Sequence, residues 1–523
     1  MKISRYILIL IFIIIVGLVI NLVPVLYGIF PITYDQGRDF LWVKNQIDFH
    51  QPTLIGPAGS MQGVYFGPLW FWLLSLPYIL FNGSPIAMTL FNALIVYASL
   101  ILTFWVIKKY DFRVAYFFIF LGFISPAIHS QASYAFSQHL LPLLTAFFIY
   151  SLTMILKSSN RWQFILAWFW VSLMFHAEPP VSIFSIPALI IISVMAQRRQ
   201  KFLNLKTIVL ALVAFIIPFL PLLLFDFRHD FIQLRSVVSF LGGDTRGLQE
   251  IAPLTLWQRL LDRQEKLFFS FKEVIFNKLG PVFFGVLIIL ARLFQQSKLK
   301  PIWKSFMQAS LIYLISFLLI FTLYPHELKL FYLAGIQIIF LIWLALGLSI
   351  FWQNPIRKKI IIVFLSLLAL YNLKPFAFIK SWSQNFSGQR YLGSLYINQL
   401  AAIDWIYQDA AGKGFKVYTF APPIYDYSIQ YLIFWRGLNR YGYLPEEFSY
   451  QPDQPEYVVQ KNRQLQRLSD KIKLSENLIY FLITPGSPDQ RSRWYYGLKD
   501  LPISLLEEYV LPDDTKVEKY SLL

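Results

Sequence analysis

Long apolar segments, separated by short polar ones, dominate the first 373 residues of the chain. A helix of about 20 apolar residues is long enough to cross the roughly 30 Å hydrocarbon core of a bilayer. The pattern therefore predicts an all-α polytopic membrane protein with about 11–12 transmembrane helices. A shorter run at 68–81 contains Pro68 and Pro77, so a full crossing by this segment stays open. The longer runs lie at 6–27, 86–107, 114–130, 138–156, 162–176, 179–196, 206–225, 281–296, 303–323, 330–352 and 359–373.

After Leu373 the pattern changes to mixed polarity with frequent Pro and Gly. Strand-like runs at 416–420 and 478–484 alternate there with helix-like stretches at 397–410 and 455–472. Such alternation is typical of a small α/β domain. The sequence thus predicts two domains, a transmembrane module at 1–373 and a soluble domain at 374–523.

Composition agrees with a membrane protein. Of the 523 residues, 57% are hydrophobic and 14% are charged, whereas about a quarter of the residues of a soluble domain are charged. The net charge of +17 could indicate nucleic-acid binding, but the basic residues form short clusters between apolar runs rather than one basic domain. The chain has no Cys, which excludes disulfides and thiolate chemistry.

The basic clusters predict the orientation in the membrane, because cytoplasmic loops are enriched in Lys and Arg. The polar loops and the C-terminal domain all fall on the outer side if these clusters are cytoplasmic and if 68–81 does not cross fully, or if a neighbouring run is divided differently. We expect a multi-pass protein of the cytoplasmic (inner) membrane with an extracytoplasmic active site. The clusters are 108–109, 157–161, 198–206, 292–304 and 357–359, and the outer loops are 28–67, 131–137, 177–178, 226–280 and 324–329.

The first outer loop carries the most informative polar residues. Asp35 and Asp39 are four residues apart, so a short surface helix would place both carboxylates on one face, with Arg38 beside Asp35. Ionisable groups at the mouth of a membrane helix are costly unless they are solvated or functional. One interpretation is a general base tuned by a neighbouring cation. The other is a charged juxtamembrane helix with a salt bridge.

Two short motifs resemble the opening of the GT-C membrane glycosyltransferases, and in particular the protein O-mannosyltransferase and aminoarabinose transferase branch. Gln36 stands where those families often have a second acid, and Gly67 stands at the first proline of their Pro-Pro-Leu motif. The resemblance implies a polyprenyl-phosphate-linked sugar donor, inversion at the anomeric carbon and Asp35 as base. It leaves open whether the acceptor is a glycan, a lipid or a protein. The motifs are Tyr34-Asp35-Gln36-Gly37-Arg38 and Tyr65-Phe66-Gly67-Pro68-Leu69.

A lipid phosphate leaving group needs cationic or hydrogen-bonding partners, and the other outer loops offer candidates. Each has a structural alternative: a Pro-rich hairpin for His176 and Glu178, a local ion-pair network for Arg228, and a snorkelling lysine for Lys329. Asp35, with Asp39, is the predicted catalytic group. The predicted substrate-binding residues are Tyr34, Arg38, Tyr65, His176, Glu178, Arg228, His229, His326, Lys329 and Tyr332.

No cofactor is expected. His176, Glu178, His326 and Glu327 are metal-ligand types, but their spacing matches no recognised site. In the C-terminal domain, the aromatic-rich stretch 425–443 suits either an acceptor glycan or ordinary packing.

Two other functions compete with a glycosyltransferase. A transporter or lipid-linked glycan flippase would show repeated halves, or ionisable residues near the middle of its helices. A glycan polymerase or ligase of another fold would carry its key basic residues in a large late loop. The gathering of polar residues on one side, together with a single soluble domain, favours an enzyme.

Overall fold

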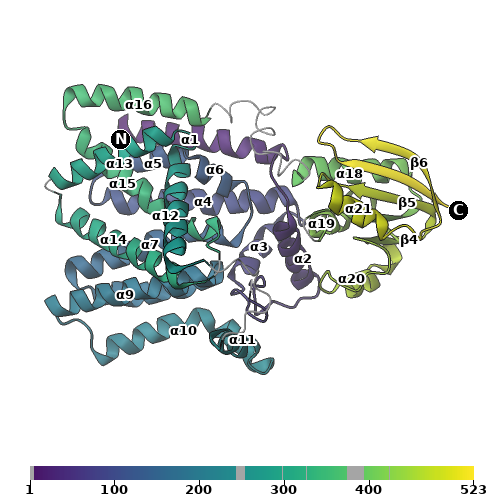
Figure 1. Ribbon diagram of the computed structural model, residues 1–523, viewed down its shortest axis with the longest axis horizontal. Helices are drawn as coiled ribbons and strands as arrows, with labels where there is room; N and C mark the ends of the chain where they lie inside the picture. The colour runs from purple at the N-terminus through teal and green to yellow at the C-terminus, as the bar shows by residue number, and fades with distance from the viewer. Residues whose placement is uncertain are drawn as a thin grey trace.

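The computed structural model describes residues 5–59, 61–242, 254–296, 299–325, 327–373, 394–422 and 425–523. It consists of a long helical module with a sheet-containing domain at one end (Figure 1). The predicted boundary at 373/374 stays a prediction, because the described chain stops at Leu373 and resumes at Ser394.

Every apolar run that the sequence marks folds as a helix or as a pair of helices, which confirms the predicted all-α polytopic module. Among the described residues, five helices are long and apolar enough to cross a membrane, and the count rises to seven if each of two bent pairs is one span. The helices of this module are α1 (Arg5–Leu26), α3 (Leu69–Leu80), α4 (Pro85–Lys108), α5 (Phe112–Phe123), α6 (Pro126–Ala132), η1 (Ser137–Leu140), α7 (Leu141–Ser158), α8 (Arg161–Ala177), α9 (Pro179–Arg199), α10 (Leu205–Arg228), α13 (Gly280–Gln296), α14 (Pro301–Leu323), η2 (Leu330–Leu333), α15 (Gln337–Phe351) and α16 (Pro355–Leu373).

Local sequence explains the interruptions. The apolar run at 114–130 bends by 62° between α5 and α6, where Ser125 caps the new helix and Pro126 occupies its first turn. The short run at 68–81 forms the 12-residue helix α3. At 1.5 Å per residue α3 is about 18 Å long, too short to cross a bilayer by itself.

The two ends of the helical module differ in chemistry. At one end the basic segments meet, with Lys300 donating to Asp111 over 2.9 Å beside Lys108, Lys109 and Arg113. The predicted outer loops meet at the other end, next to the C-terminal domain. The separation of basic clusters from polar loops follows the pattern that the positive-inside rule predicts.

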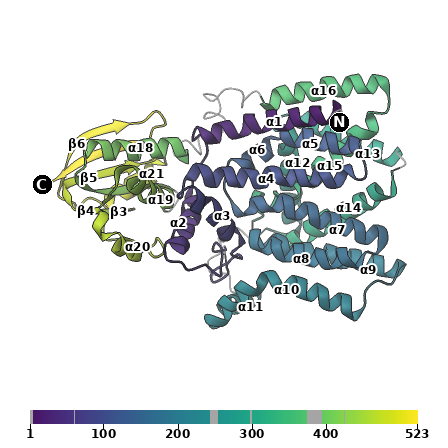
Figure 2. The ribbon, with the colours of Figure 1, turned by 180° about the vertical axis from the view of Figure 1, so that it is seen from behind.

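The structure has three further helices before the C-terminal domain. They are α2 (Tyr34–Asp48), α11 (Ile232–Leu241) and α12 (Leu256–Ile275), so the segment predicted as one long loop at 226–280 contains two of them. Helix α12 runs across the bundle (Figure 1) and packs on α14, α15 and α6. Helix α10 forms an edge of the module, with α11 beyond its end (Figure 2).

The C-terminal domain is the predicted α/β unit. Its five-stranded sheet has the order β3-β1-β5-β7-β6, with β1 parallel to β3 and β5, and β7 antiparallel to β5 and β6. Helices α18 and α19 cover one face and α21 covers the other. The elements are α18 (Tyr396–Asp409), β1 (Gly414–Phe420), α19 (Tyr427–Arg436), β2 (Leu444–Pro445), β3 (Glu447–Ser449), α20 (Lys461–Arg467), β4 (Ile472–Lys473), β5 (Ser475–Ile483), α21 (Pro488–Tyr496), β6 (Ile503–Val510) and β7 (Lys516–Leu522).

The domain rests directly on α2. A Cβ atom at Gly37 would lie 2.2 Å from the backbone nitrogen of Ser428, so the start of α19 touches the α2 backbone. Further along α2, Asn45 donates to the carbonyl of Val459 over 2.6 Å and accepts from Gln464 over 2.9 Å. The helix with the candidate base is therefore packed between the membrane module and the C-terminal domain.

Candidate active site

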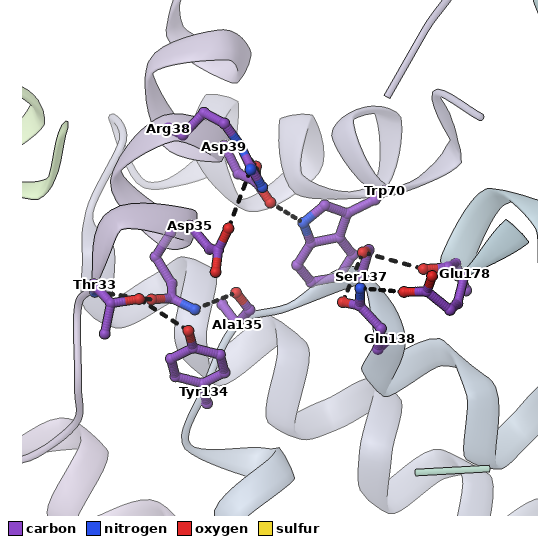
Figure 3. A network of polar contacts seen from close by, with 12 residues as sticks. Thr33, Asp35, Arg38, Asp39, Trp70, Tyr134, Ala135, Ser137, Gln138 and Glu178 are labelled. Atoms are coloured by element: carbon purple, nitrogen blue, oxygen red, sulfur yellow. Dashed lines mark hydrogen bonds and ion pairs between the residues drawn. The ribbon is translucent and has the colours of Figure 1, made fainter. Parts of the chain in front are cut away.

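Arg38 joins Asp35 and Asp39 on α2. Its guanidinium lies 3.1 Å from Asp35 Oδ1 and donates to Asp39 Oδ1 over 2.8 and 2.9 Å. Thr33 begins the helix, and its backbone N–H donates to the side-chain oxygen of Gln36, a form of N-terminal capping. The predicted shared face is thus present, with the cation between the carboxylates (Figure 3).

The two acids have different surroundings. Asp39 is fully buried, and its second oxygen accepts a 2.9 Å hydrogen bond from the indole of Trp70. Burial raises the pKa of Asp39 to about 6, and the Arg38 charge limits the rise. The side chain of Asp35 is 33% exposed. Only Asp35 combines a neighbouring cation with access for a substrate, so Asp39 is suited to positioning Arg38.

Gln36 stands where the families that the sequence resembles often have a second acid. It connects α2 to the next outer loop. Its amide donates to the carbonyl of Ala135 over 3.1 Å, which a carboxylate could not do. The hydroxyl of Thr33 lies 2.9 Å from that of Tyr134. The loop at 131–137 is thereby placed beside the first turn of α2 (Figure 3).

Glu178 extends the polar region toward the next pair of spans. It lies between α8 and α9, is 2% exposed, and accepts a 2.7 Å hydrogen bond from Gln138 (Figure 3). Burial raises the pKa of Glu178 to about 8. The buried carboxyl therefore holds its proton at neutral pH.

The loop at 324–329, which we call the late loop, and the first half of α12 continue this polar region. Burial and then the charge of Glu178 raise the pKa of Tyr324 and of Tyr332, whereas Arg263 lowers that of Tyr324. Arg263 is 2% exposed and donates to the carbonyls of Phe321 and Tyr324 over 3.3 and 3.4 Å. Polar groups therefore continue from α2 through Glu178 to α12.

Four cations gather where α12 meets the late loop. Lys266 lies 3.3 Å from Asp262 and 3.5 Å from Glu327, which also pairs with Lys329. Two acids among four cations leave a net positive charge. We refer to Arg259, Arg263, Lys266 and Lys329 as the cationic cluster.

Several predicted substrate-binding residues have other contacts. His176 is buried with one ring nitrogen 2.9 Å from the carbonyl of Pro218 and the other 3.4 Å from the backbone N–H of Leu69. It occupies the space that Gly67 leaves, since a Cβ there would lie 2.1 Å from the imidazole. Both ring nitrogens thus bond to backbone groups.

The residues at the end of α10 also make local contacts. The carboxylate of Asp226 accepts from the backbone N–H groups of Gln233 and Leu234, at the start of α11, rather than from Arg228. Arg228 is exposed, and the ring of His229 stacks on Phe225 at 4.0 Å. Tyr65 packs edge-on to the same Phe225.

Of the remaining predicted residues, Tyr34 lies beside Arg38, Lys329 lies in the late loop, and Tyr332 lies in η2 directly after it. His326 lies outside the described residues. Within the described chain, no group of three His, Asp or Glu residues is arranged to hold a metal ion. The expectation of no cofactor stays a prediction.

Four features of this region are not predicted by the sequence: Trp70, Tyr134, Gln138 and the α12 cations. The cations had a recognisable pattern, because Arg259, Arg263 and Lys266 recur at helical spacing in a segment that begins with a Thr255–Gln258 capping box. Trp70 and Gln138 had no recognisable pattern. Trp70 lies in an apolar helix and Gln138 is a buried amide, and neither kind of residue indicates its partner.

Known proteins resemble this chain in structure but not in sequence. No model of a known protein family matches the sequence, and no curated protein matches it. Solved structures that match over nearly the whole chain include two crystal structures of ArnT. ArnT from Cupriavidus metallidurans bound to undecaprenyl phosphate has a TM-score of 0.58 at 11% identity, covering 98% of this chain and 97% of that one. The chain has the ArnT fold.

The apo form of the same ArnT matches equally, with a TM-score of 0.59 at 11% identity over 99% of this chain and 98% of that one. The match to ArnT covers the C-terminal domain as well as the helices. The predicted GT-C, aminoarabinose-transferase-like architecture is thereby confirmed as a fold.

Proposed function

We propose that this protein is a membrane glycosyltransferase that moves a sugar from a polyprenyl-phosphate donor to an acceptor hydroxyl. The observation that carries the proposal is the accessible Asp35 carboxylate, held by Arg38 at the polar end of an ArnT-like fold. The ArnT structure with undecaprenyl phosphate supports a lipid phosphate as the leaving group.

Asp35 acts as the general base. The acceptor oxygen bonds to the anomeric carbon from the side opposite the phosphate, and its proton moves to Asp35. The bond between the anomeric carbon and the phosphate oxygen breaks, and the electron pair leaves with the lipid phosphate. Arg38 holds the carboxylate in place through their ion pair. Configuration at the anomeric carbon is inverted.

The cationic cluster stabilises the leaving phosphate. Negative charge develops there as the sugar departs, and cations fixed in advance stabilise it without reorganisation. Lys266 and Lys329 are the accessible members, with side chains 21% and 40% exposed. Arg263, which is buried, positions the start of the late loop through its bonds to the carbonyls of Phe321 and Tyr324.

The test is release of the lipid phosphate by purified protein. With a radiolabelled polyprenyl-phosphate sugar and an envelope extract as acceptor source, wild-type protein should release polyprenyl phosphate. Asp35→Asn should lower the rate by about 100-fold or more, the usual contribution of general base catalysis. Asp470→Asn is the matched control, because Asp470 is 70% exposed in the C-terminal domain. Full activity in Asp35→Asn would disprove the role of Asp35.

The proposed orientation places the active site and C-terminal domain outside the cytoplasmic membrane. The absence of Cys gives single-cysteine labelling no background. In intact cells a membrane-impermeant maleimide should label Asp470→Cys, whereas Lys109→Cys, at the basic end, should react only after lysis. The reverse result would invert the topology.

A further inference from the structure

Four tyrosines from two domains form one aromatic group beside α2. The ring of Tyr34 lies 4.9 Å from that of Tyr427 and 6.3 Å from that of Tyr425. Tyr425 in turn stacks on Tyr457 at 5.2 Å with the planes 15° apart. We call Tyr34, Tyr425, Tyr427 and Tyr457 the aromatic platform.

The aromatic platform adjoins the proposed base. Tyr34 directly precedes Asp35, and the Arg38 guanidinium that pairs with Asp35 lies 5.6 Å from the centre of the Tyr34 ring. One cation thus contacts both the platform and the carboxylate. A molecule lying on the platform would have its edge close to Asp35.

Buried polar groups hold the platform in place. Asp426 is fully buried and accepts hydrogen bonds from the hydroxyl of Tyr457 over 2.7 Å and from Gln430 over 2.8 Å. The hydroxyl of Tyr427 donates to the carbonyl of Tyr457 over 3.1 Å, and Lys461 donates to Gln430 over 2.8 Å. A buried carboxylate is costly unless it is fully bonded, so the network fixes the tyrosines before any ligand arrives.

Packing between the domains accounts for only part of the Tyr425 surface. Its ring borders Tyr34 of α2 at 6.3 Å, yet the residue remains 38% exposed. An aromatic ring that served only the interface would be covered. Tyr425 instead keeps part of its surface open to solvent, next to Tyr34 and so near the Arg38–Asp35 pair.

The chemistry of this surface selects its ligand. A pyranose ring has apolar C–H faces and a rim of hydroxyl groups, and the negative face of an aromatic ring attracts C–H bonds. We propose that the aromatic platform binds a pyranose ring of a carbohydrate acceptor, with Tyr425 under the ring face and an acceptor hydroxyl directed to Asp35. The role of Asp35 in this arrangement rests on the proposed function, but the binding of sugar to the platform does not.

Binding is tested without a donor, by saturation-transfer NMR on the full-length protein in nanodiscs, since maltoside detergents themselves carry pyranoses. The probes are methyl pyranosides of mannose, galactose, glucose, rhamnose and N-acetylglucosamine. At least one should receive saturation at its ring C–H protons from the wild-type protein. Tyr425→Ala should weaken its binding at least tenfold, and Tyr425→Phe should retain it.

The matched control is Tyr496→Ala, because Tyr496 is 69% exposed on α21, across the sheet from α19. It should bind like wild type, and all variants should keep the wild-type unfolding midpoint. Saturation of none of the probes, or equal binding by Tyr425→Ala and wild type, would overturn the proposal. Binding of serine-rich peptides in place of the glycosides would overturn it in favour of a protein acceptor. Sugar binding without release of lipid phosphate would support the aromatic platform as a sugar site and contradict the proposed transferase activity.

Discussion

The indole N–H of Trp70 donates a 2.9 Å hydrogen bond to the buried carboxylate of Asp39. This bond connects α3 to α2, and through Asp39 and Arg38 it reaches Asp35. The proposed base is therefore positioned by residues that themselves stay away from solvent.

Trp70→Phe should lower both stability and turnover. The change leaves one oxygen of Asp39 without a partner, which costs about 1–3 kcal/mol for a buried acceptor. We expect a lower midpoint of thermal unfolding by intrinsic fluorescence, and a lower kcat with little change in the acceptor KM. Trp72→Phe is the control, since the indole of Trp72 bonds the carbonyl of Thr53 at an exposed site. Equal effects of the two variants would contradict this chain of contacts.

Gly37→Ala should separate the C-terminal domain from α2. The added methyl group would lie 2.2 Å from the Ser428 nitrogen, and backbone cannot move aside as a side chain can. Overpacking of this kind costs about 1–3 kcal/mol. We expect at least a tenfold loss of activity together with a lower unfolding midpoint. Gly285→Ala adds the same methyl where no atom lies within 4 Å and should behave as wild type.

Glu178 should make stability depend on pH. Its folded-state pKa is raised to about 8, so the folded protein binds a proton that the unfolded chain has already released. Stability should therefore fall as pH rises from about 4.5 to about 8. Glu178→Gln, which mimics the protonated acid, should remove this dependence, so that its unfolding midpoint exceeds that of wild type increasingly toward pH 8.

The control for Glu178 is Glu327→Gln. The hydrogen bond from Lys329 lowers the pKa of Glu327, so that carboxylate stabilises the fold only above its unfolded-state pKa. The variant should have a slightly lower midpoint than wild type at neutral pH, and the difference should vanish in acid. A pH-independent difference between Glu178→Gln and wild type would show that Glu178 is ionised in the folded protein.

Removing cations from the cluster should weaken donor binding. A charge-assisted hydrogen bond contributes about 1.5–3 kcal/mol, so Lys266→Ala and Lys329→Ala should each raise the donor KM by about tenfold or more. The effect should diminish at high salt. Lys272→Ala is the control on the same helix, because Lys272 lies outside the cationic cluster, where it pairs with Glu273. Unchanged KM in both cluster variants would place the phosphate elsewhere.

Local patterns were sufficient to predict much of this protein. The length of the apolar runs predicted the helices, the alternation after Leu373 predicted the α/β domain, and the basic clusters predicted which loops meet. The four-residue spacing of Asp35 and Asp39 predicted their shared face around Arg38, because helical periodicity acts within one turn. Each of these features depends on residues close together in the chain.

Tertiary structure decided the partners. Four contacts of the site join residues that lie between 31 and 391 positions apart in the sequence. They are the contacts of Trp70 with Asp39, Gln138 with Glu178, Ala135 with Gln36 and Ser428 with Gly37. Hydropathy predicts that a segment forms an apolar helix, but it does not predict which neighbouring segment that helix packs against. These contacts could therefore not be predicted. For the same reason the contacts of His176 could not be predicted, and its ionisable ring suggested a substrate-binding residue. In the fold, its two nitrogens bond backbone groups that only packing brings to it.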